Sequence, residues 1–318
     1  MNENKSTYFL HFAFCVNDGY VPYICVTIKG IIENHRNHKV IIHVLSDYIS
    51  VEKKTLLEEV INGYNAEIVV HIVDDTPLRG LKDSWSIYTW YRLLIPEYLE
   101  TGIHRVLYLD ADTIVCSDVS ELFTMDMDGY AVAGCIDPES FNDATYKRCH
   151  YVKEKQYICA GVLLMNLDMW REHQLSKTMV AFSHKNKDWI WFVDQETINV
   201  LCQDTKIVLP LKYGIMDYFF KEDRFYDSPY KEQLFECIKN PAVVHYAGQS
   251  PWKRELATAV MQDVWDKYNI MLKHPAQKVY ITKGWALIKM LIWNALHPNR
   301  QSDRLTKEKI LLKLEKTQ

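Results

Sequence analysis

The stretch from Arg105 to Val115, RVLYLDADTIV, is an apolar run that stops at two carboxylates. Residues 106–109 have the length and composition of a strand buried on both faces, which places Asp110 at its carboxyl end. Ligands bind at that end of an open α/β sheet, and the i, i+2 spacing lets Asp110 and Asp112 turn toward one point. Two neighbouring carboxylates repel each other unless a cation lies between them, and hard oxygen ligands select Mg²⁺ or Mn²⁺. The pattern predicts a metal site, although D-x-D is also common in surface loops.

The composition is that of a globular protein. The chain has 318 residues, of which 48% are hydrophobic and 25% charged, which suits one large α/β domain with appendages. A net charge of −4 gives no general attraction for nucleic acid, so we expect no such partner. The 20 Tyr and 9 Trp exceed what a core needs, and such polar-edged aromatic side chains suit sugar rings and membrane interfaces.

Cysteine usage and the N-terminus indicate the compartment. Eight cysteines are scattered without C-x-x-C spacing, so we expect them to be reduced core residues. The first residues, MNENK, lead into a strand without the basic and long apolar regions of a signal peptide. Uninterrupted apolar runs stay shorter than the ~18 residues of a spanning helix. We therefore expect a cytoplasmic protein.

The first 72 residues predict alternating strands and helices. Residues 8–16 and 40–45 are rich in β-branched and aromatic residues, as is the segment 66–72, whereas 20–33 has helical spacing and Ser50 is placed to cap a second helix. This alternation predicts a doubly wound, mostly parallel α/β sheet. Neither G-x-G-x-x-G nor a P-loop is present in the sequence. If a nucleotide binds, a metal must help to hold its phosphates.

A single cation, Arg92, interrupts the apolar and aromatic segment 84–100. We predict this segment to be helical up to a break before Pro96. An arginine in such a helix needs an anion, and the predicted topology offers Asp110 and Asp112. The alternative is that Arg92 extends to solvent.

Three later stretches place polar or small residues beside predicted elements. The small-residue turn Cys159-Ala160-Gly161 leads into an apolar strand, and its glycine suggests a close approach of backbone to ligand. Residues 193–199 have the pattern of a first helical turn rich in acids and amides. His245 ends a short strand beside a Gly/Pro loop and is a candidate third metal ligand. Further elements are predicted as a helix at 117–123, a strand at 130–136, a helix starting at Trp170 and a strand at 242–245.

Six ordered stretches together resemble the family 8 glycosyltransferases. These are FAFCVNDGYVPYICVTIKGI, YTWYRLLIPEYL, RVLYLDADTIV, CAGVLLMNLDMW, FVDQETIN and VVHYAGQSPWK, which span residues 8–253. Members of that family are retaining enzymes with one nucleotide-sugar-binding domain of the A type, and bacterial members build lipopolysaccharide, capsule and other surface glycans. The resemblance implies the same fold and activity here.

The resemblance also implies roles for residues. Asp110, Asp112 and His245 match the family's ligands of Mn²⁺, or of Mg²⁺, against the UDP diphosphate. Asp194 and Gln195 match the pair that faces the donor sugar. Further implied residues are Arg92, matching the arginine before D-x-D; Asn17, Asp18 and Tyr20 at uracil and ribose; and Ala111, Cys159, Ala160, Gly161, Gly248 and Lys253 around the UDP-sugar.

Three departures from the family pattern stand out. Cys159 occupies the turn position where the family usually has an asparagine that touches the donor sugar. The late motif is one residue shorter, with Ser250 directly before Pro-Trp, so Lys253 is the candidate to replace the motif lysine on the diphosphate. Tyr213-Gly214-Ile215 stands where an asparagine is frequent, at a position relevant to the acceptor.

The leading hypothesis is the transfer of glucose or galactose from a UDP-sugar to a hydroxyl of a surface glycan or lipid-linked saccharide, with retention of configuration. Because glutamine is a poor nucleophile, we expect a front-face displacement supported by Gln195, with Asp194 on the sugar hydroxyls. A nucleotidyltransferase is a second possibility, but it would normally show a glycine-rich loop after the first strand. A third is a catalytically weak carbohydrate-binding or scaffold protein, which the departures favour.

The C-terminal segment differs in charge from the rest of the chain. Residues 278–318 contain nine Lys or Arg and three acids in a chain of net charge −4. With Trp285, Trp293 and their apolar neighbours, this segment predicts an amphipathic helix that lies on an anionic membrane. We therefore divide the chain into a catalytic domain, 1–276, and a basic helical tail, 277–318, peripherally bound to the inner face of the cell membrane. The alternative is a tail that packs on the catalytic domain or forms a homodimer.

Overall fold

The computed structural model describes residues 9–81, 86–221, 225–226, 229–248, 250–253, 260–279, 283–286, 288–289, 292 and 307–316. Its strands are β1 (Phe9–Cys15), β2 (Lys39–Ser46), β3 (Ala66–Ile72), β4 (Arg105–Leu109), β5 (Thr113–Val115), β6 (Val132–Ile136), β7 (Ile158–Asn166), β8 (Lys206–Leu209), β9 (Ile215–Met216) and β10 (Val243–His245). Its helices are α1 (Val21–Asn34), α2 (Val51–Ile61), α3 (Ile87–Tyr91), α4 (Ile95–Tyr98), α5 (Ser120–Thr124), α6 (Asp143–Cys149), α7 (Leu167–Glu172), α8 (Leu175–Asn186), α9 (Val193–Leu201), α10 (Tyr218–Lys221), α11 (Lys231–Lys239), α12 (Gln262–Asn269) and α14 (Lys307–Lys316). Short 3-10 helices cover Asp18–Tyr20, Thr76–Leu78, Arg92–Leu94, Pro138–Phe141, Lys153–Lys155 and Leu211–Tyr213.

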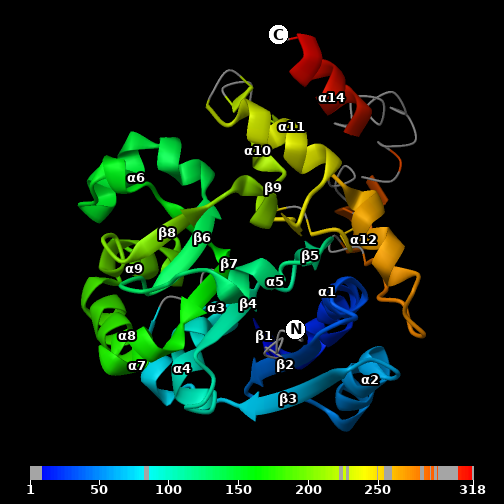
Figure 1. Ribbon diagram of the computed structural model, residues 1–318, viewed down its shortest axis with the longest axis horizontal. Coiled ribbons are helices and arrows are strands. Elements are labelled where there is room, and N and C mark those ends of the chain that lie inside the picture. Colours follow the sequence, from blue (N-terminus) through cyan, green and yellow to red (C-terminus); the bar gives the residue numbers. More distant parts are fainter. Residues whose placement is uncertain are drawn as a thin grey trace, which may run out of the picture.

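A central sheet has the strand order β3-β2-β1-β4-β7-β6-β8 (Figure 1). The pairs β1/β2, β2/β3, β1/β4 and β6/β8 are parallel, whereas β7 runs antiparallel to both of its neighbours. The predicted mostly parallel α/β sheet is therefore confirmed. Its D-x-D strand, β4, lies in the middle of the sheet, where helices cover both faces.

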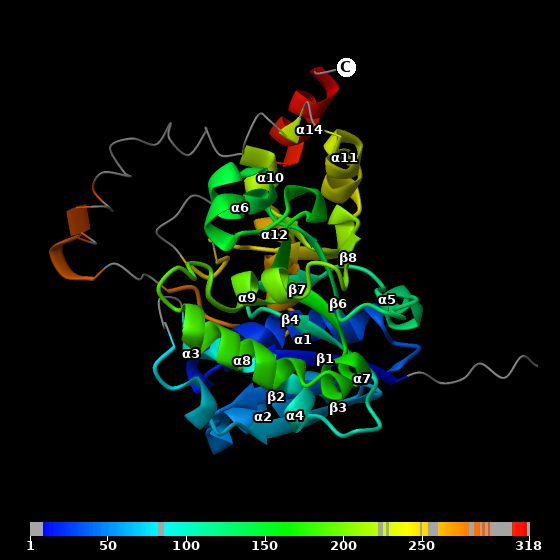
Figure 2. The ribbon, with the colours of Figure 1, turned by 90° about the vertical axis from the view of Figure 1, so that its left-hand side faces the viewer.

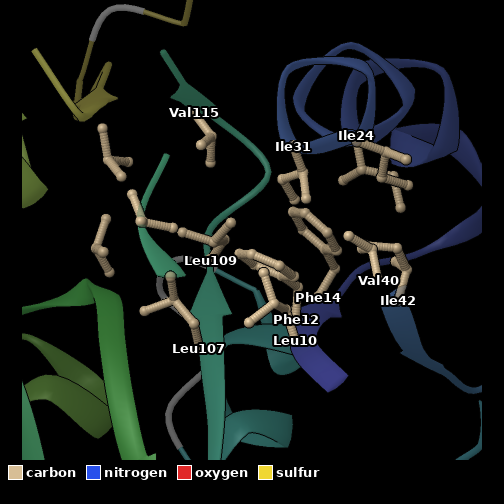
Figure 3. Close-up of a cluster of buried hydrophobic side chains, with 14 of the residues drawn as sticks. Leu10, Phe12, Phe14, Ile24, Ile31, Val40, Ile42, Leu107, Leu109 and Val115 are labelled. Carbon is tan, nitrogen blue, oxygen red and sulfur yellow. The ribbon is translucent and has the colours of Figure 1, made fainter. Parts of the chain in front are cut away.

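Alternating side chains of the strands supply two cores, one on each face of the sheet. Phe12 and Phe14 of β1 face a cluster that includes Ile24 and Ile31 of α1 (Figure 3). The intervening Ala13 faces the second cluster, which contains side chains from α3, α4, α7, α8 and α9. Because successive strand residues point to opposite faces, this division is what a doubly wound sheet requires. The helices on the two sides are visible in Figure 2.

A small second sheet, β5-β10-β9, lies beside the first. Its strand β5 follows the D-x-D directly and pairs antiparallel with β10, so that Thr113 lies opposite His245. Helix α1 packs closely on this sheet, since a Cβ on Gly30 would lie 2.5 Å from the carbonyl oxygen of Val115. The strand ending at His245 was predicted, but its pairing with β5 was not. This pairing brings His245 to the two aspartates.

Two predicted helix limits are wrong. The segment around Arg92 is α3, a 3-10 turn and α4, with Pro96 inside the first turn of α4. The helical path does not break before Pro96, because the missing N–H of a proline costs nothing in a first turn. Helix α7 starts at Leu167 and not at Trp170, since the side chain of Asn166 accepts a hydrogen bond from the Met169 N–H and caps the helix.

The tail contributes one helix to the body of the protein. In α14, Ile310 and Leu314 are buried in the same apolar cluster as Leu234 and Ile238 of α11, and the two helices lie together in Figures 1 and 2. This part of the tail therefore packs on the catalytic domain, the alternative considered above. Among the described helices, none combines the length and apolar character needed to cross a membrane. The tail residues 280–282, 287, 290–291, 293–306 and 317–318, Trp293 included, lie outside the described residues.

Candidate active site

Asp110, Asp112 and His245 come together at the carboxyl end of β4. His245 Nε2 lies 3.6 Å from Asp110 Oδ2 and 3.3 Å from Asp112 Oδ1. One ligand atom from each residue lies within 4.8 Å of the other two. The backbone holds this geometry, since the Asp110 N–H donates to the Gly161 carbonyl at 2.8 Å and β5 pairs with β10. The structure thus assembles the three residues that the resemblance implied.

The three side chains fit a hard divalent cation. Two carboxylates and an imidazole suit Mn²⁺ or Mg²⁺, and the aspartate side chains are 27% and 23% exposed, which leaves room for ligands from a substrate. Gly161 makes the space: a Cβ there would lie 2.2 Å from His245 Cε1 and 2.7 Å from Asp110 Oδ2. The backbone at Gly161 therefore approaches the cluster side chains closely, whereas its predicted approach to a ligand stays a prediction.

Arg92 lies buried behind the cluster. Its guanidinium contacts Asp110 Oδ1 at 2.9 Å and Asp194 Oδ2 at 2.8 Å, and it donates to the carbonyls of Thr89 and Ala160. At 3% exposed it does not extend to solvent. The prediction that Arg92 pairs with Asp110 is confirmed, but its second partner is Asp194 and not Asp112. The reason is that α9 packs against α3, the helix just before Arg92, and the sequence did not reveal this contact.

The two carboxylates that share Arg92 differ in their pKa. Burial raises the pKa of Asp110, but Arg92 and His245 outweigh burial, and the pKa is lowered. At Asp194, burial wins over Arg92 and is reinforced by the charge of Asp110, so the pKa rises to about 7. One guanidinium cannot fully compensate two buried charges. Asp110 is therefore the ionised member of the pair and the better cation ligand.

Asp194 and Gln195 lie at the start of α9, after a residue with unusual backbone geometry. Val193 has φ of +40°, a region that β-branched residues rarely adopt. Gln195 Oε1 accepts from the Ala160 N–H at 2.9 Å, and its Nε2 donates to Asp137 Oδ2 at 3.3 Å. Strain of this kind persists only where surrounding contacts hold it, and it is common at active sites. The contacts of Asp194 and Gln195 supply such a hold.

Asp137 is a site residue that the sequence analysis missed. It directly follows β6, is buried, and pairs with Gln195, as described above. Burial raises the pKa of Asp137 to about 6. The signal was available, because Asp137 is a carboxylate at the carboxyl end of an apolar strand, the same pattern as at β4. Asp217, just after β9, is a second buried carboxylate in this position and pairs with Lys221.

The residues assigned to uracil and ribose lie in one turn. Asn17 caps the 3-10 turn by accepting from the Tyr20 N–H at 3.1 Å, and Asp18 accepts from the Ser50 N–H at 2.7 Å. Tyr20 is half-exposed, with its ring 6.0 Å from that of Trp252. Both aspartate and asparagine side chains thus have structural partners. Their contact with a nucleotide stays a prediction.

The late loop lies across from this turn. Gly248 has φ of +83°, and a Cβ there would lie 2.5 Å from the Tyr218 hydroxyl, so the position requires glycine. Trp252 stacks on Tyr23 at 4.1 Å, and the Lys253 N–H donates to the Ser250 carbonyl at 3.0 Å. These ring contacts hold Trp252 against α1 and beside the turn at Tyr20. The role of Lys253 on a diphosphate is not tested by these contacts.

The sequence matches the model of a known transferase family. The model of glycosyl transferase family 8 matches residues 11–256. The chain belongs to this family. It is 26% identical over 282 residues to a putative glycosyltransferase of Haemophilus influenzae, covering 87% of this chain and 82% of that one. It is 25% identical over 244 residues to a lipopolysaccharide 1,2-glucosyltransferase of Escherichia coli, covering 74% and 71%.

Solved structures agree on the fold. The galactosyltransferase LgtC, crystallised with donor and acceptor sugar analogues, superposes with a TM-score of 0.72 at 24% identity, covering 88% of this chain and 100% of that one. The apo structure of WbbM, a bifunctional glycosyltransferase, gives a TM-score of 0.70 at 22% identity over 84% of this chain and 50% of that one. At these identities the likeness shows the fold alone. The predicted family and fold are both confirmed.

Proposed function

We propose that the protein transfers glucose or galactose from UDP to a hydroxyl of a saccharide acceptor, with retention of configuration and with Mn²⁺ or Mg²⁺ bound. The observation that carries this is the Asp110, Asp112 and His245 cluster at the sheet edge, directly in front of the Arg92 and Asp194 pair. The E. coli relative named as a lipopolysaccharide glucosyltransferase supports a glycan acceptor.

In this proposal the cluster binds the leaving group. A bound divalent cation would neutralise the charge that develops on UDP as the anomeric bond breaks. Arg92 keeps Asp110 ionised and fixed, because it contacts one oxygen while the other faces His245. The site is thus organised before substrate arrives, which lowers the cost of reorganisation in the transition state.

Gln195 and Asp194 act on the sugar. Gln195 is held at both ends of its amide by Ala160 and Asp137, so its position is fixed but its amide is no competent nucleophile. Asp194 is buried against Arg92, which disfavours attack on an anomeric carbon. Both observations support a front-face displacement. In it the departing phosphate takes the acceptor's proton and Gln195 supports the cation-like sugar.

Release of UDP from a panel of UDP-sugars, with Mn²⁺ and with excess EDTA, tests the function. We expect metal-dependent release from UDP-glucose or UDP-galactose even without acceptor, since water can replace the hydroxyl. Absence of release from all donors, together with glycan binding, would establish the scaffold alternative. With an acceptor, the anomeric configuration of the product tests retention: a β-linked product from the α-linked donor contradicts it.

We also propose that the tail contacts an anionic membrane peripherally, which suits a lipid-linked acceptor. Trp285, Ile288 and Ile292 are 78%, 45% and 54% exposed and follow helical spacing beside Lys283 and Lys289. The described part of this segment projects from the body in Figure 2. Exposed apolar and basic side chains in this arrangement favour the interface of an anionic bilayer.

Liposome flotation of the full chain tests this. The variant Trp285→Ser/Ile288→Ser/Ile292→Ser should float less than wild type with anionic vesicles at low salt. Truncation would be a poor test, because it removes α14 and uncovers α11. Val51→Ser, at an equally exposed apolar side chain on α2, is the control. Equal flotation of wild type and triple variant would contradict the membrane role, and loss of a homodimer in the variant would favour a protein partner.

A further inference from the structure

Cys159 lies on the far side of the metal-cluster histidine. Its sulfur is 3.6 Å from His245 Nδ1, while Nε2 of the same ring faces the two aspartates. The Gly161 N–H donates to the sulfur at 3.4 Å and so fixes the cysteine side chain. Cys159 is 6% exposed and His245 is 5% exposed. The contact is therefore protected from water.

A histidine that binds a metal through one nitrogen usually donates the N–H of the other nitrogen to a neighbouring acceptor. That bond fixes the tautomer and the ring orientation, and its loss typically weakens metal binding 10- to 100-fold. Within the described part of the chain, the Cys159 sulfur is the polar atom that contacts Nδ1. The sulfur therefore occupies the position of this outer acceptor.

We propose that Cys159 is a positioning residue of the cation site: it accepts the Nδ1–H of His245 and holds Nε2 toward a metal bound by Asp110 and Asp112. This inference rests on the metal site of the proposed function. It differs from the expectation that residue 159 touches the donor sugar. In this chain the thiol acts on the metal ligand instead.

Two residues of β7, Cys159 and Gly161, act together on the ring of His245. Cys159 and Gly161 are i and i+2 on β7, so they lie on the same face of the sheet. Gly161 leaves the space that the imidazole fills, since a Cβ would lie 2.8 Å from His245 Nδ1. Cys159 then supplies the acceptor at the edge of that space. Strand β7 thus sets both the place and the rotation of the ring, although it contributes no ligand.

Substitutions that separate size from hydrogen bonding test the role. Cys159→Ser keeps an acceptor, Cys159→Val removes it at similar volume, and Cys159→Ala removes it without adding bulk. Cys202→Val, at a buried cysteine just after α9, is the matched control. The unfolding free energy of each variant, measured without metal, shows whether the fold is retained.

The readout is the dissociation constant for Mn²⁺, measured from the EPR signal of free Mn²⁺ with protein alone and with a fixed excess of UDP. We expect Cys159→Val and Cys159→Ala to weaken binding about 10-fold or more, and Cys159→Ser and Cys202→Val to stay within about 3-fold of wild type. In turnover, the Mn²⁺ concentration for half activation should rise in the first two variants, while kcat at saturating Mn²⁺ changes less than about 2-fold.

Two outcomes would overturn the inference and leave the proposed function intact. One is unchanged Mn²⁺ affinity in Cys159→Val and Cys159→Ala. The other is an equal loss in Cys159→Ser, which would show that packing and not hydrogen bonding matters. A wild-type protein that binds no Mn²⁺ under either condition would instead overturn the metal site itself, and this inference with it.

Discussion

Buried histidines in two parts of this protein, His245 at the cluster and His43 in the sheet, have pKa values that are shifted in opposite directions. At the cluster, burial opposes the charge of His245, but the Cys159 sulfur and the Asp112 carboxylate outweigh it and raise the pKa well above its ordinary value. Across β1, β2 and β3, burial lowers the pKa of His43, and together with the adjacent His11 and His71 it brings the value to about 3. His245 therefore lies beside carboxylates as part of the proposed cation site, whereas His43 is a neutral imidazole in the core.

The second region is a row of three stacked imidazoles. His11 Nδ1 lies 3.0 Å from His43 Nε2, and His43 Nδ1 lies 3.0 Å from His71 Nε2. Each neutral ring has one donor and one acceptor, so both hydrogen bonds form when the N–H groups point the same way along the row. Glu67 and Glu100 raise the pKa of His11 and His71, but burial outweighs them and both pKa values are lowered.

The comparison shows that burial alone does not decide the direction in which the pKa of a histidine shifts. Both regions are shielded from water, yet only the cluster pairs its imidazole with carboxylates that keep some exposure. Carboxylates select cations, whereas neutral imidazoles satisfy one another. Substitutions at the cluster should therefore disturb the balance of buried charges. Substitutions in the imidazole row should change how the stability depends on pH at acid pH.

The largest effect is expected at Arg92. Arg92→Met leaves the buried Asp194 and the partly exposed Asp110 without their cation. Breaking such a buried pair costs about 3–5 kcal/mol of unfolding free energy. Denaturant unfolding measures it. Arg36→Met, which removes an exposed arginine from its pair with Glu33, should lower the unfolding free energy far less. If Arg92→Met/Asp194→Asn is no more stable than the single variant, the charge-balance explanation is wrong.

The second effect is on turnover. Asp110→Asn or Asp112→Asn should lower turnover about 10²-fold or more and leave the fold intact, because each removes a charged cation ligand and relieves carboxylate repulsion. Asp128→Asn, at an exposed aspartate, is the control. Steady-state rates and Mn²⁺ binding are measured together. Full activity in either variant, or in excess EDTA, contradicts the metal assignment.

A smaller effect is expected at Asp194 and Gln195, and it distinguishes contact with the donor sugar from contact with the nucleotide. Asp194→Asn should lower turnover about 10-fold, equivalent to about 1.4 kcal/mol, with UDP affinity nearly unchanged. Gln195→Ala should act in the same direction but more weakly. Calorimetry with UDP and Mn²⁺ is compared with steady-state rates. A UDP affinity that falls in step with the rate would move both residues to the nucleotide.

The smallest effect concerns the imidazole row. The folded-state pKa of His43 lies below the ordinary value of 6.5, so the unfolded chain binds more protons and stability falls as the pH drops through that window. His43→Leu should reduce the pH slope of the unfolding free energy by about 1 kcal/mol per pH unit between about pH 4 and about 6.5. An unaltered slope in His43→Leu would mean that the row does not titrate.

Local pattern by itself determined much of this protein. Apolar runs bounded by turn residues predicted β1, β2, β3, β4, β7 and β10, because strand composition and the ends of strands are local properties. The place of Asp110 at the end of β4 followed from the same logic, and so did the need of Arg92 for an anion. The six ordered motifs pointed to the family that the comparison confirms.

Only the tertiary structure decided how distant segments meet. The pairing of β5 with β10 puts His245 beside residues far away in sequence, and no local pattern encodes that register. Asp194 reaches Arg92, and Asp137 reaches Gln195, because α9 begins at the edge of the sheet where β6 ends. The position of Cys159 against His245 follows from the same convergence. These contacts depend on packing between elements, so they appear only once the whole sheet is assembled.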